Sequence, residues 1–204
     1  MGRYVIGVAG GTGAGKTALA EGLAGACRGA AVIIHEDRYY RDNSHLPAAS
    51  RESLNYDHPE ALDLDLLAEH VRELVSGGII NQPVYDYAWH TRSRETIRVS
   101  PARLIIVEGL FTLFNEFLWG MVDLKVFLDL EEDIRLSRRI ERDTRERGRT
   151  RESVIDQWNS TVQPMHRLFI EPTRSRADMI LSGGDPVADN VAMIRAFLAS
   201  KNIL

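Results

Sequence analysis

The fold is decided by residues 10–17, Gly10-Gly11-Thr12-Gly13-Ala14-Gly15-Lys16-Thr17, which match the pattern G-x-x-x-x-G-K-[ST] in full. An apolar run before them, Tyr4 to Ala9, predicts a buried parallel strand, and an Ala- and Leu-rich run after them, Lys16 to Cys27, predicts a helix. In this context the glycines let backbone N–H groups turn toward phosphate oxygens, and the helix N-terminus adds partial positive charge. We therefore expect residues 10–17 to bind the phosphates of ATP, with Lys16 at the β- and γ-phosphates and Thr17 on Mg²⁺.

Strand-like and helix-like runs alternate along the remaining chain. Further buried strands are predicted at residues 31–34, 104–107, 124–128 and 179–181, and further helices at 62–76, 131–146, 153–169 and 187–199. This alternation predicts an α/β fold of the P-loop NTPase type, a doubly wound parallel sheet of about five strands with flanking helices, as one domain over residues 1–204. Residues 41–60 predict a loop or short turns, and strand formers around a polar middle at about 79–99 predict an inserted β-hairpin.

The bulk properties argue against several classes of protein. A net charge of -4 and an isoelectric point of about 5.9 do not give the basic surface that nucleic acid requires. Cys27 is the one cysteine, so no disulfide forms within the chain and a reducing compartment is expected. The chain runs from Met1 directly into the first strand, which predicts no signal peptide, and no apolar run approaches the ~20 residues that span a bilayer. We expect a cytoplasmic protein without nucleic-acid or membrane partners.

Two classes of P-loop protein remain: a kinase of a small metabolite, and a GTPase-like switch or an ATPase that drives a partner. A GTPase usually reads guanine with Asn-Lys-x-Asp after a strand, and here Asp129 is followed by Leu130-Glu131-Glu132. A kinase needs a base and a metal site beyond the carboxyl ends of its strands. Asp37 and Glu108 follow the second and third predicted strands and are the candidates, although a carboxylate there also suits an ordinary turn.

Arginine crowds the segment after the fourth strand, at positions Arg135, Arg138, Arg139, Arg142, Arg145, Arg147, Arg149 and Arg151. Residues 135, 138, 142 and 145 recur at helical spacing and are expected on one helix face. Guanidinium groups clamp phosphoryl oxygens and Gly148 suggests a hinge, so residues of about 138–152 predict an Arg-rich lid that closes over phosphates. A solvated helix with many ion pairs is the alternative for any single arginine.

Several further strings complete a recognisable pattern. They are Glu36-Asp37-Arg38-Tyr39-Tyr40, Asn55-Tyr56-Asp57-His58-Pro59, Pro83-Val84-Tyr85-Asp86-Tyr87, His90-Thr91-Arg92, Glu108-Gly109, Arg142-Asp143 and Glu146-Arg147-Gly148-Arg149. With the phosphate loop, their order and spacing resemble the uridine kinase (uridine–cytidine kinase) family from about Tyr4 to Asp178. The resemblance implies a five-stranded parallel sheet with a hairpin and an Arg-bearing lid. It also implies the transfer of phosphate from ATP to the 5′-hydroxyl of uridine or cytidine.

The resemblance further implies a role for individual residues. Asp37 matches the general base, and the magnesium environment is expected at Thr17, Glu108 and Asp37. The groups expected to act on the transferring phosphate are Lys16, Arg142 and Arg147. The residues expected to contact the nucleoside are Asp57 and Arg139 at the ribose hydroxyls, Tyr85 and His90 at the pyrimidine edge, and Tyr56, Tyr87, Arg149 and Gln157 around it. A histidine donates or accepts according to its tautomer, so His90 suits both uracil and cytosine.

The resemblance also implies small-molecule partners and an assembly. The partners are a nucleoside and ATP or GTP, and family members are commonly tetramers that CTP inhibits, so a homo-oligomer is expected. The chain departs from the family at Leu181-Ser182-Gly183-Gly184, where members usually have Pro-Arg-Gly-Gly, which affects the donor side and assembly. The alternatives are a kinase of another alcohol, such as phosphoribulose or pantothenate, and a non-catalytic ATP-binding protein. A kinase of the first kind needs an anion pocket instead of a base-reading hairpin.

Overall fold

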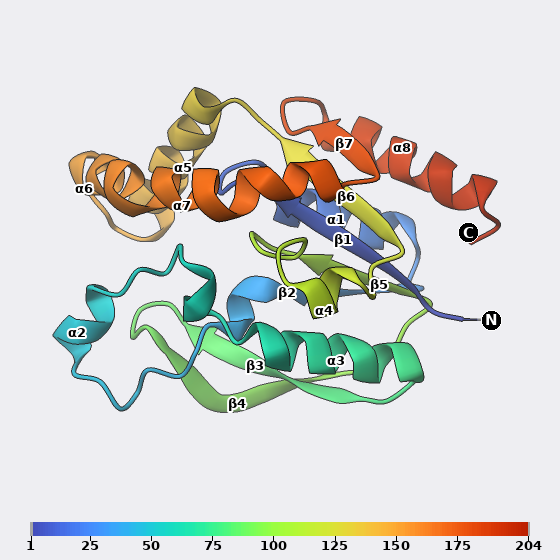
Figure 1. Ribbon diagram of the computed structural model, residues 1–204, viewed down its shortest axis with the longest axis horizontal. Coiled ribbons are helices and arrows are strands. Elements are labelled where there is room, and N and C mark those ends of the chain that lie inside the picture. The colour runs from blue at the N-terminus through green and yellow to red at the C-terminus, as the bar shows by residue number, and fades with distance from the viewer. Residues whose placement is uncertain (1, 204) are drawn as a thin grey trace.

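The computed structural model describes residues 2–203, and a five-stranded parallel sheet lies at its centre (Figure 1). Its strands are β1 (Tyr4–Gly10), β2 (Ala31–His35), β5 (Leu104–Glu108), β6 (Leu124–Asp129) and β7 (Met179–Ser182). They are ordered β2-β5-β1-β6-β7, and every neighbouring pair is parallel. The predicted doubly wound sheet is confirmed, and the phosphate loop leaves its central strand.

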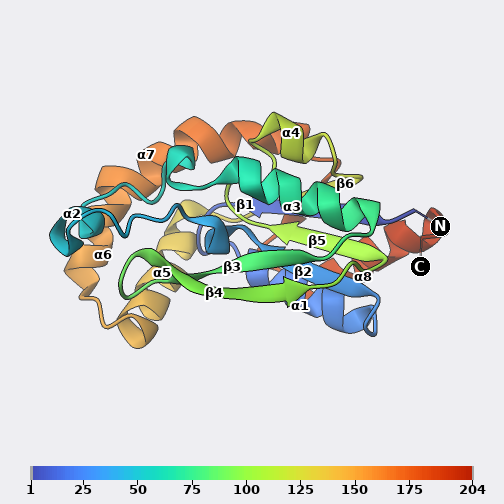
Figure 2. The same ribbon diagram turned by 90° about the horizontal axis from the view of Figure 1, so that it is seen from below.

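Helices cover both faces of this sheet. They are α1 (Lys16–Ala26), α2 (Ala48–Glu52), α3 (Leu64–Ser76), α4 (Glu116–Trp119), α5 (Glu132–Glu146), α6 (Arg151–Gln157), α7 (Gln163–Met165) and α8 (Val187–Ser200). Figure 2 shows α3 and α4 above the sheet and α1 and α8 below it. A hydrophobic core lies on each face of the sheet, and successive residues of β1 point into opposite cores. Val5 packs on the side of α3, and Ile6 packs on the side of α1 and α8. Within residues 2–203, no helix is long and apolar enough to cross a membrane.

A separate two-stranded hairpin stands beside the main sheet. It pairs β3 (Ile80–Asp86) with β4 (Thr91–Val99) in antiparallel register, with an irregularity between Pro83 and Tyr85. The hairpin packs against α3 and against the 3₁₀ turn Glu36–Tyr39 that follows β2. The predicted insertion at 79–99 is therefore present, and Arg92 beside its tip donates to the carbonyl of Tyr40.

The helix predicted at 153–169 is longer and less regular than expected. Its helical path starts at Arg151 and continues to Arg176, but wide π turns at Trp158–Val162 and His166–Ile170 interrupt the α geometry. Pro164 follows the first wide turn and has no N–H to give to the preceding turn, so the regular hydrogen-bond ladder cannot continue through it. The predicted helix at 62–76 also starts two residues later, because the side chain of Asp63 caps the N–H of Leu66.

Acid is expected to destabilise the protein through His166. This side chain is buried, its Nε2 lies 3.2 Å from Glu171 Oε2, and burial lowers its pKa from 6.5 to about 4. Between these two values the unfolded chain binds a proton that the folded chain does not. The unfolding free energy should therefore fall as the pH falls from 6.5 toward 4, by on the order of 2 kcal/mol.

The measurement is urea unfolding of the wild type, His166→Gln and His45→Gln between about pH 7 and about pH 4.5. His45 is exposed, so its variant should follow the wild type at every pH. The His166→Gln variant should lose less stability than the wild type on acidification. Parallel curves for wild type and His166→Gln would contradict the assignment.

Candidate active site

The phosphate loop occupies the turn between β1 and α1. Gly13 and Gly15 adopt φ angles of 80° and 102°, and a Cβ at Gly13 would lie 2.5 Å from the carbonyl oxygen of Arg135, so glycine is required there for both reasons. Lys16 Nζ donates to the carbonyl of Gly11 at 3.0 Å. Burial lowers the pKa of Lys16, and the nearby Glu108 carboxylate opposes that shift. The loop thus has the shape and charge of a phosphate site.

A carboxylate and a hydroxyl meet beside this loop. Thr17 Oγ1 donates to Glu108 Oε1 at 3.2 Å, so the structure brings together two of the residues predicted for magnesium. His35, which no motif singled out, lies 2.8 Å from the same oxygen through Nδ1, and this hydrogen bond raises the pKa of its imidazole. Its position at the last residue of β2 is the signal in the sequence that pointed to it.

Glu36 fixes the chain segment that carries Glu108. Its buried carboxyl accepts hydrogen bonds from Phe111 N and Thr112 Oγ1, and burial raises its pKa to about 7. A Cβ at Gly109 would lie 2.3 Å from Glu36 Cβ, so only glycine allows this approach. The ends of β2 and β5 are therefore locked to each other.

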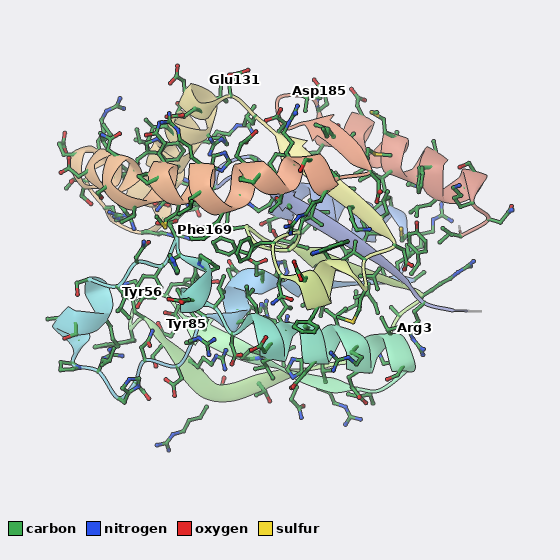
Figure 3. The ribbon with its side chains drawn as sticks, in the orientation of Figure 1. Arg3, Tyr56, Tyr85, Glu131, Phe169 and Asp185 are labelled. Carbon is green, nitrogen blue, oxygen red and sulfur yellow. The ribbon has the colours of Figure 1, made fainter. Side chains whose placement is uncertain are left out.

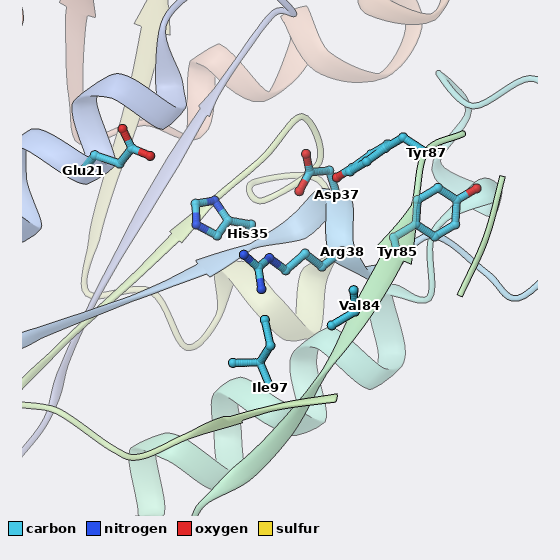
Figure 4. Close-up of a pocket in the computed structure, with 8 residues that line it drawn as sticks. All are labelled: Glu21, His35, Asp37, Arg38, Val84, Tyr85, Tyr87 and Ile97. Atoms are coloured by element: carbon cyan, nitrogen blue, oxygen red, sulfur yellow. The ribbon is translucent and has the colours of Figure 1, made fainter. Parts of the chain in front are cut away.

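The predicted base lies in a cavity of about 370 Å³ between α1, the end of β2 and the hairpin (Figure 4). Figure 4 shows the phenol oxygen of Tyr87 next to the Asp37 carboxylate, while the Tyr85 ring points away from it. Burial of the Tyr87 hydroxyl and the neighbouring Asp37 carboxylate both raise the pKa of that phenol. The guanidinium of Arg147 lies 5.8 Å from the centre of the Tyr87 ring. Asp37, the hairpin and the predicted lid are thus in contact.

The predicted aromatic contacts form one cluster. Tyr56 stacks on His90 with ring centres 4.9 Å apart, and Tyr85 lies 5.3 Å from Tyr87. Tyr40 joins the two pairs, at 5.4 Å from Tyr56 and 5.1 Å from Tyr85. In Figure 3 the labelled Tyr56 and Tyr85 lie where the loop after α2 meets the hairpin. Tyr40 was not predicted, although it stands in the string that also holds Asp37.

Four residues predicted to contact the ribose or the nucleoside form a polar group. Arg139 Nη1 lies 3.9 Å from Asp57 Oδ1, and Arg139 Nη2 donates to Gln157 Oε1 at 3.0 Å. Arg149 donates to the same Gln157 oxygen. Asp57 is buried, which raises the pKa of its carboxyl, while Arg139 opposes that shift. The group joins two regions that are far apart in the sequence, residue 57 and residues 139–157, so its assembly agrees with a shared role.

Arg139 also connects this polar group to the phosphate loop. Its Nη1 donates to Thr12 Oγ1 at 3.4 Å, and the side chain is 7% exposed. The guanidinium of Arg139 therefore lies between Thr12, predicted to bind ATP, and Asp57, predicted to bind the nucleoside. Arg138, one position earlier, donates to the carbonyl of Gly183 at 3.0 Å and so reaches the loop in which the family arginine is missing.

Arg145 keeps the helical spacing that puts it on the same face of α5 as Arg135, Arg138 and Arg142, but its contacts are those of a surface ion pair. That side chain is exposed and pairs with Glu141 at 3.4 Å and Glu146 at 2.6 Å. The buried polar residues of α5 are Arg135, Arg139 and Asp143, which follow one another at intervals of four residues. No role had been predicted for Asp143. The alternative of a solvated ion-paired arginine therefore holds for Arg145.

The two lid arginines predicted to act on phosphate both contact Asp143, the last residue of this buried stripe. Arg142 Nε donates to Asp143 Oδ1 at 2.9 Å, and Arg147 Nη1 lies 3.5 Å from the same oxygen. Both keep exposed surface, and Arg142 is close enough to Lys16 to affect its pKa. Arg142 thus lies near the phosphate loop, while Arg147 lies over the Tyr87 ring.

The parallel sheet, the phosphate loop after its central strand and the adjoining carboxylates and arginines define a P-loop protein with the architecture of the P-loop kinases. The model of the phosphoribulokinase / uridine kinase family matches residues 5–188. The chain belongs to that family.

Curated relatives and solved structures agree with this membership. A protein named uridine kinase from Geobacillus kaustophilus is 48% identical over 205 residues, which cover 98% of this chain and 97% of the relative. Another from Anoxybacillus flavithermus is 50% identical over 181 residues, covering 88% and 86%. Among solved structures, a possible uridine kinase from Bacillus stearothermophilus has a TM-score of 0.64 at 19% identity over 89% of each chain. A phosphoribulokinase from Rhodobacter spheroides has a TM-score of 0.67 at 20% identity, over 91% of this chain and 74% of its own. The two structures show similarity of fold.

Proposed function

We propose that the protein transfers the γ-phosphoryl group of ATP to the 5′-hydroxyl of uridine or cytidine. The observation that carries the proposal is the contact of Arg139 with both Thr12 of the phosphate loop and Asp57 of the buried polar group. A carboxylate next to a guanidinium suits two vicinal ribose hydroxyls, and the tyrosine and histidine cluster suits a pyrimidine. Relatives that are 48% and 50% identical carry the name uridine kinase.

In this proposal the described residues divide the work of the reaction. Asp37 orients the 5′-hydroxyl and accepts its proton, and the backbone of the phosphate loop with Lys16 holds the phosphates of ATP. Arg142 and Arg147 close over the transferring group, stabilise its charge and exclude water. Tyr85 and His90 select the pyrimidine. The nearness of Arg147 to the Tyr87–Asp37 pair supports such a closure.

Magnesium fits the residues beside the phosphate loop. Thr17 Oγ1 and Glu108 Oε1 are oxygen ligands 3.2 Å apart, which is the donor chemistry that Mg²⁺ prefers. No cluster of three or more His, Cys, Asp or Glu able to hold a metal occurs among residues 2–203, so phosphate oxygens and water would complete the coordination. We infer that Thr17 and Glu108, with Asp37 nearby, hold the ion. When bound, it would neutralise charge on the ATP phosphates.

The kinase of another small alcohol is less well supported. Phosphorylated acceptors need cations around an anion, whereas the lining of the cavity beside Asp37 offers one arginine, Arg38, among two tyrosines, two aliphatic side chains and two carboxylates. The relatives named above favour a nucleoside as well. Three further points stay predictions from the sequence. They are a homo-oligomeric state, the use of GTP as an alternative phosphate donor, and a cytoplasmic location.

The direct test is ADP release with Mg-ATP and each of uridine, cytidine, thymidine and adenosine. Uridine and cytidine should support release and thymidine and adenosine should not, because the polar group requires both ribose hydroxyls and the aromatic cluster requires a pyrimidine. Release with none of the four would refute the proposal. Release with phosphorylated or sugar-acid acceptors alone would favour the other branch of the family.

Asp57→Asn is expected to weaken recognition of the ribose. The variant keeps the shape of the side chain but loses the charge that faces Arg139, so the KM for uridine should rise by roughly 10–100-fold while the KM for ATP stays within about threefold. The measurement is a comparison of kcat/KM for uridine and 2′,3′-dideoxyuridine. The wild type should discriminate strongly and the variant weakly; equal discrimination by both would contradict the role of Asp57.

A further inference from the structure

One carboxylate lies at the centre of four arginines in the predicted lid. Asp143 is 0% exposed, and its Oδ1 accepts a hydrogen bond from Arg142 Nε at 2.9 Å and lies 3.5 Å from Arg147 Nη1. Its Oδ2 lies 3.5 Å from Arg139 Nε and 3.8 Å from Arg149 Nη1. Each oxygen thus faces a different pair of guanidinium groups.

The backbone of the same residue holds the turn that follows α5. The N–H groups of Arg147 and Arg149 donate to the carbonyl of Asp143 at 3.2 and 3.1 Å. Gly148 lies between them with φ at 62°, which lets the chain fold back over the helix end. Asp143 therefore contacts Arg147 and Arg149 twice. Its carbonyl accepts from their backbone N–H groups, and its carboxylate faces their guanidinium groups.

This arrangement differs from an ordinary helix ion pair. The exposed Arg145–Glu141 pair on the same helix stands in water, where such contacts contribute little. A buried carboxylate must be compensated, and its removal would leave several guanidinium groups close together with only mutual repulsion. The positions of the arginines around Asp143 thus depend on its charge.

We propose that Asp143 is the positioning residue of the lid, which acts on the reaction through the arginines and contacts neither substrate. Its Oδ1 orients the pair assigned to the phosphoryl group, Arg142 and Arg147, and its Oδ2 orients the pair assigned to the nucleoside, Arg139 and Arg149. The assignment of those pairs rests on the proposed function. The grouping of four arginines on one buried carboxylate does not.

Asp143→Asn keeps the shape and removes the charge. Misplacing the arginines by about an ångström should lower kcat with uridine by roughly a hundredfold and raise the KM for uridine, because both pairs lose their anchor. The matched control is Glu141→Gln, an exposed acid on the same helix, which should keep kcat within about twofold of the wild type. A KM and kcat of Asp143→Asn close to those of the control would overturn the proposal.

A double-mutant cycle separates positioning from a merely structural role. If Asp143 acts through Arg142, adding Asp143→Asn to Arg142→Gln should lower kcat by no more than about threefold beyond the single Arg142→Gln variant. Full additivity of the two losses would show that Asp143 does not act through that arginine and would overturn this part of the proposal.

Two further measurements do not depend on which acceptor the enzyme uses. The second of them does not require Asp143→Asn to fold. Trypsin should cut after Arg147 and Arg149 at least about tenfold faster in Asp143→Asn than in the wild type or Glu141→Gln, because the turn is released. Gly148→Ala, at an exposed position with open space around it, should strain the turn and raise cutting there while the fold persists. Unchanged cutting in both variants would overturn the proposal. An inactive wild type with faster cutting in the variants would refute only the proposed function.

Discussion

Asp37→Asn is expected to lower kcat with uridine by roughly 10³-fold or more while uridine binding stays within about threefold. Asparagine keeps the hydrogen-bonding shape beside Tyr87 but cannot take up the proton of the 5′-hydroxyl. The proposed ribose and base contacts lie elsewhere, on Asp57, Arg139 and the aromatic cluster, so the ground-state complex should survive. The measurement pairs steady-state ADP release with calorimetric binding of uridine.

Asp65→Asn is the matched control for this variant, since Asp65 is exposed in the first turn of α3 and is none of the predicted site residues. It should keep both kcat and uridine affinity. A loss of uridine affinity in Asp37→Asn as large as the loss of rate would show that the carboxylate binds substrate without acting as the base.

Lys16→Met should lower kcat/KM for ATP by about 10³-fold at saturating uridine. The ammonium group is held beneath the loop by the Gly11 carbonyl and lies near Glu108, so no other lysine can take its place. Methionine has a similar length and no charge, which tests the charge and not the packing. The unfolding midpoint in urea should change little.

Lys201→Met is the control for that variant, because Lys201 is exposed at the end of α8. Its kcat/KM for ATP should equal that of the wild type. An active Lys16→Met variant would mean that the backbone of the loop and the arginines alone bind the phosphates.

The fold was predictable because its signals are local. The phosphate-loop motif fixed the first strand, loop and helix, and the apolar runs located the other four strands of the sheet within a residue or two. The helical region after Arg151 was harder, since Pro164 and the wide turns alter a helix in ways that periodicity does not reveal. The start of α3 depended on a single capping contact of Asp63.

The site was predictable where a motif carries it and not where packing creates it. The strings around Asp37, Asp57 and Tyr85 were singled out, and the structure brings their residues to one region. Asp143 stands in the string Arg142-Asp143 but received no role, because its burial among arginines shows in a sequence only as a run of charges. Spacing alone also could not show that Arg145 is exposed and paired with Glu141 and Glu146.

The hairpin β3–β4 forms its own two-stranded sheet and pairs with none of the five central strands among residues 2–203. Its length and tip sequence can therefore change without shifting the register of the strands that carry the phosphate loop. Descendants of one ancestral chain could acquire new acceptors by exchanging this element while inheriting the donor half intact. An engineer could graft it in the same way, treating acceptor choice as a replaceable part.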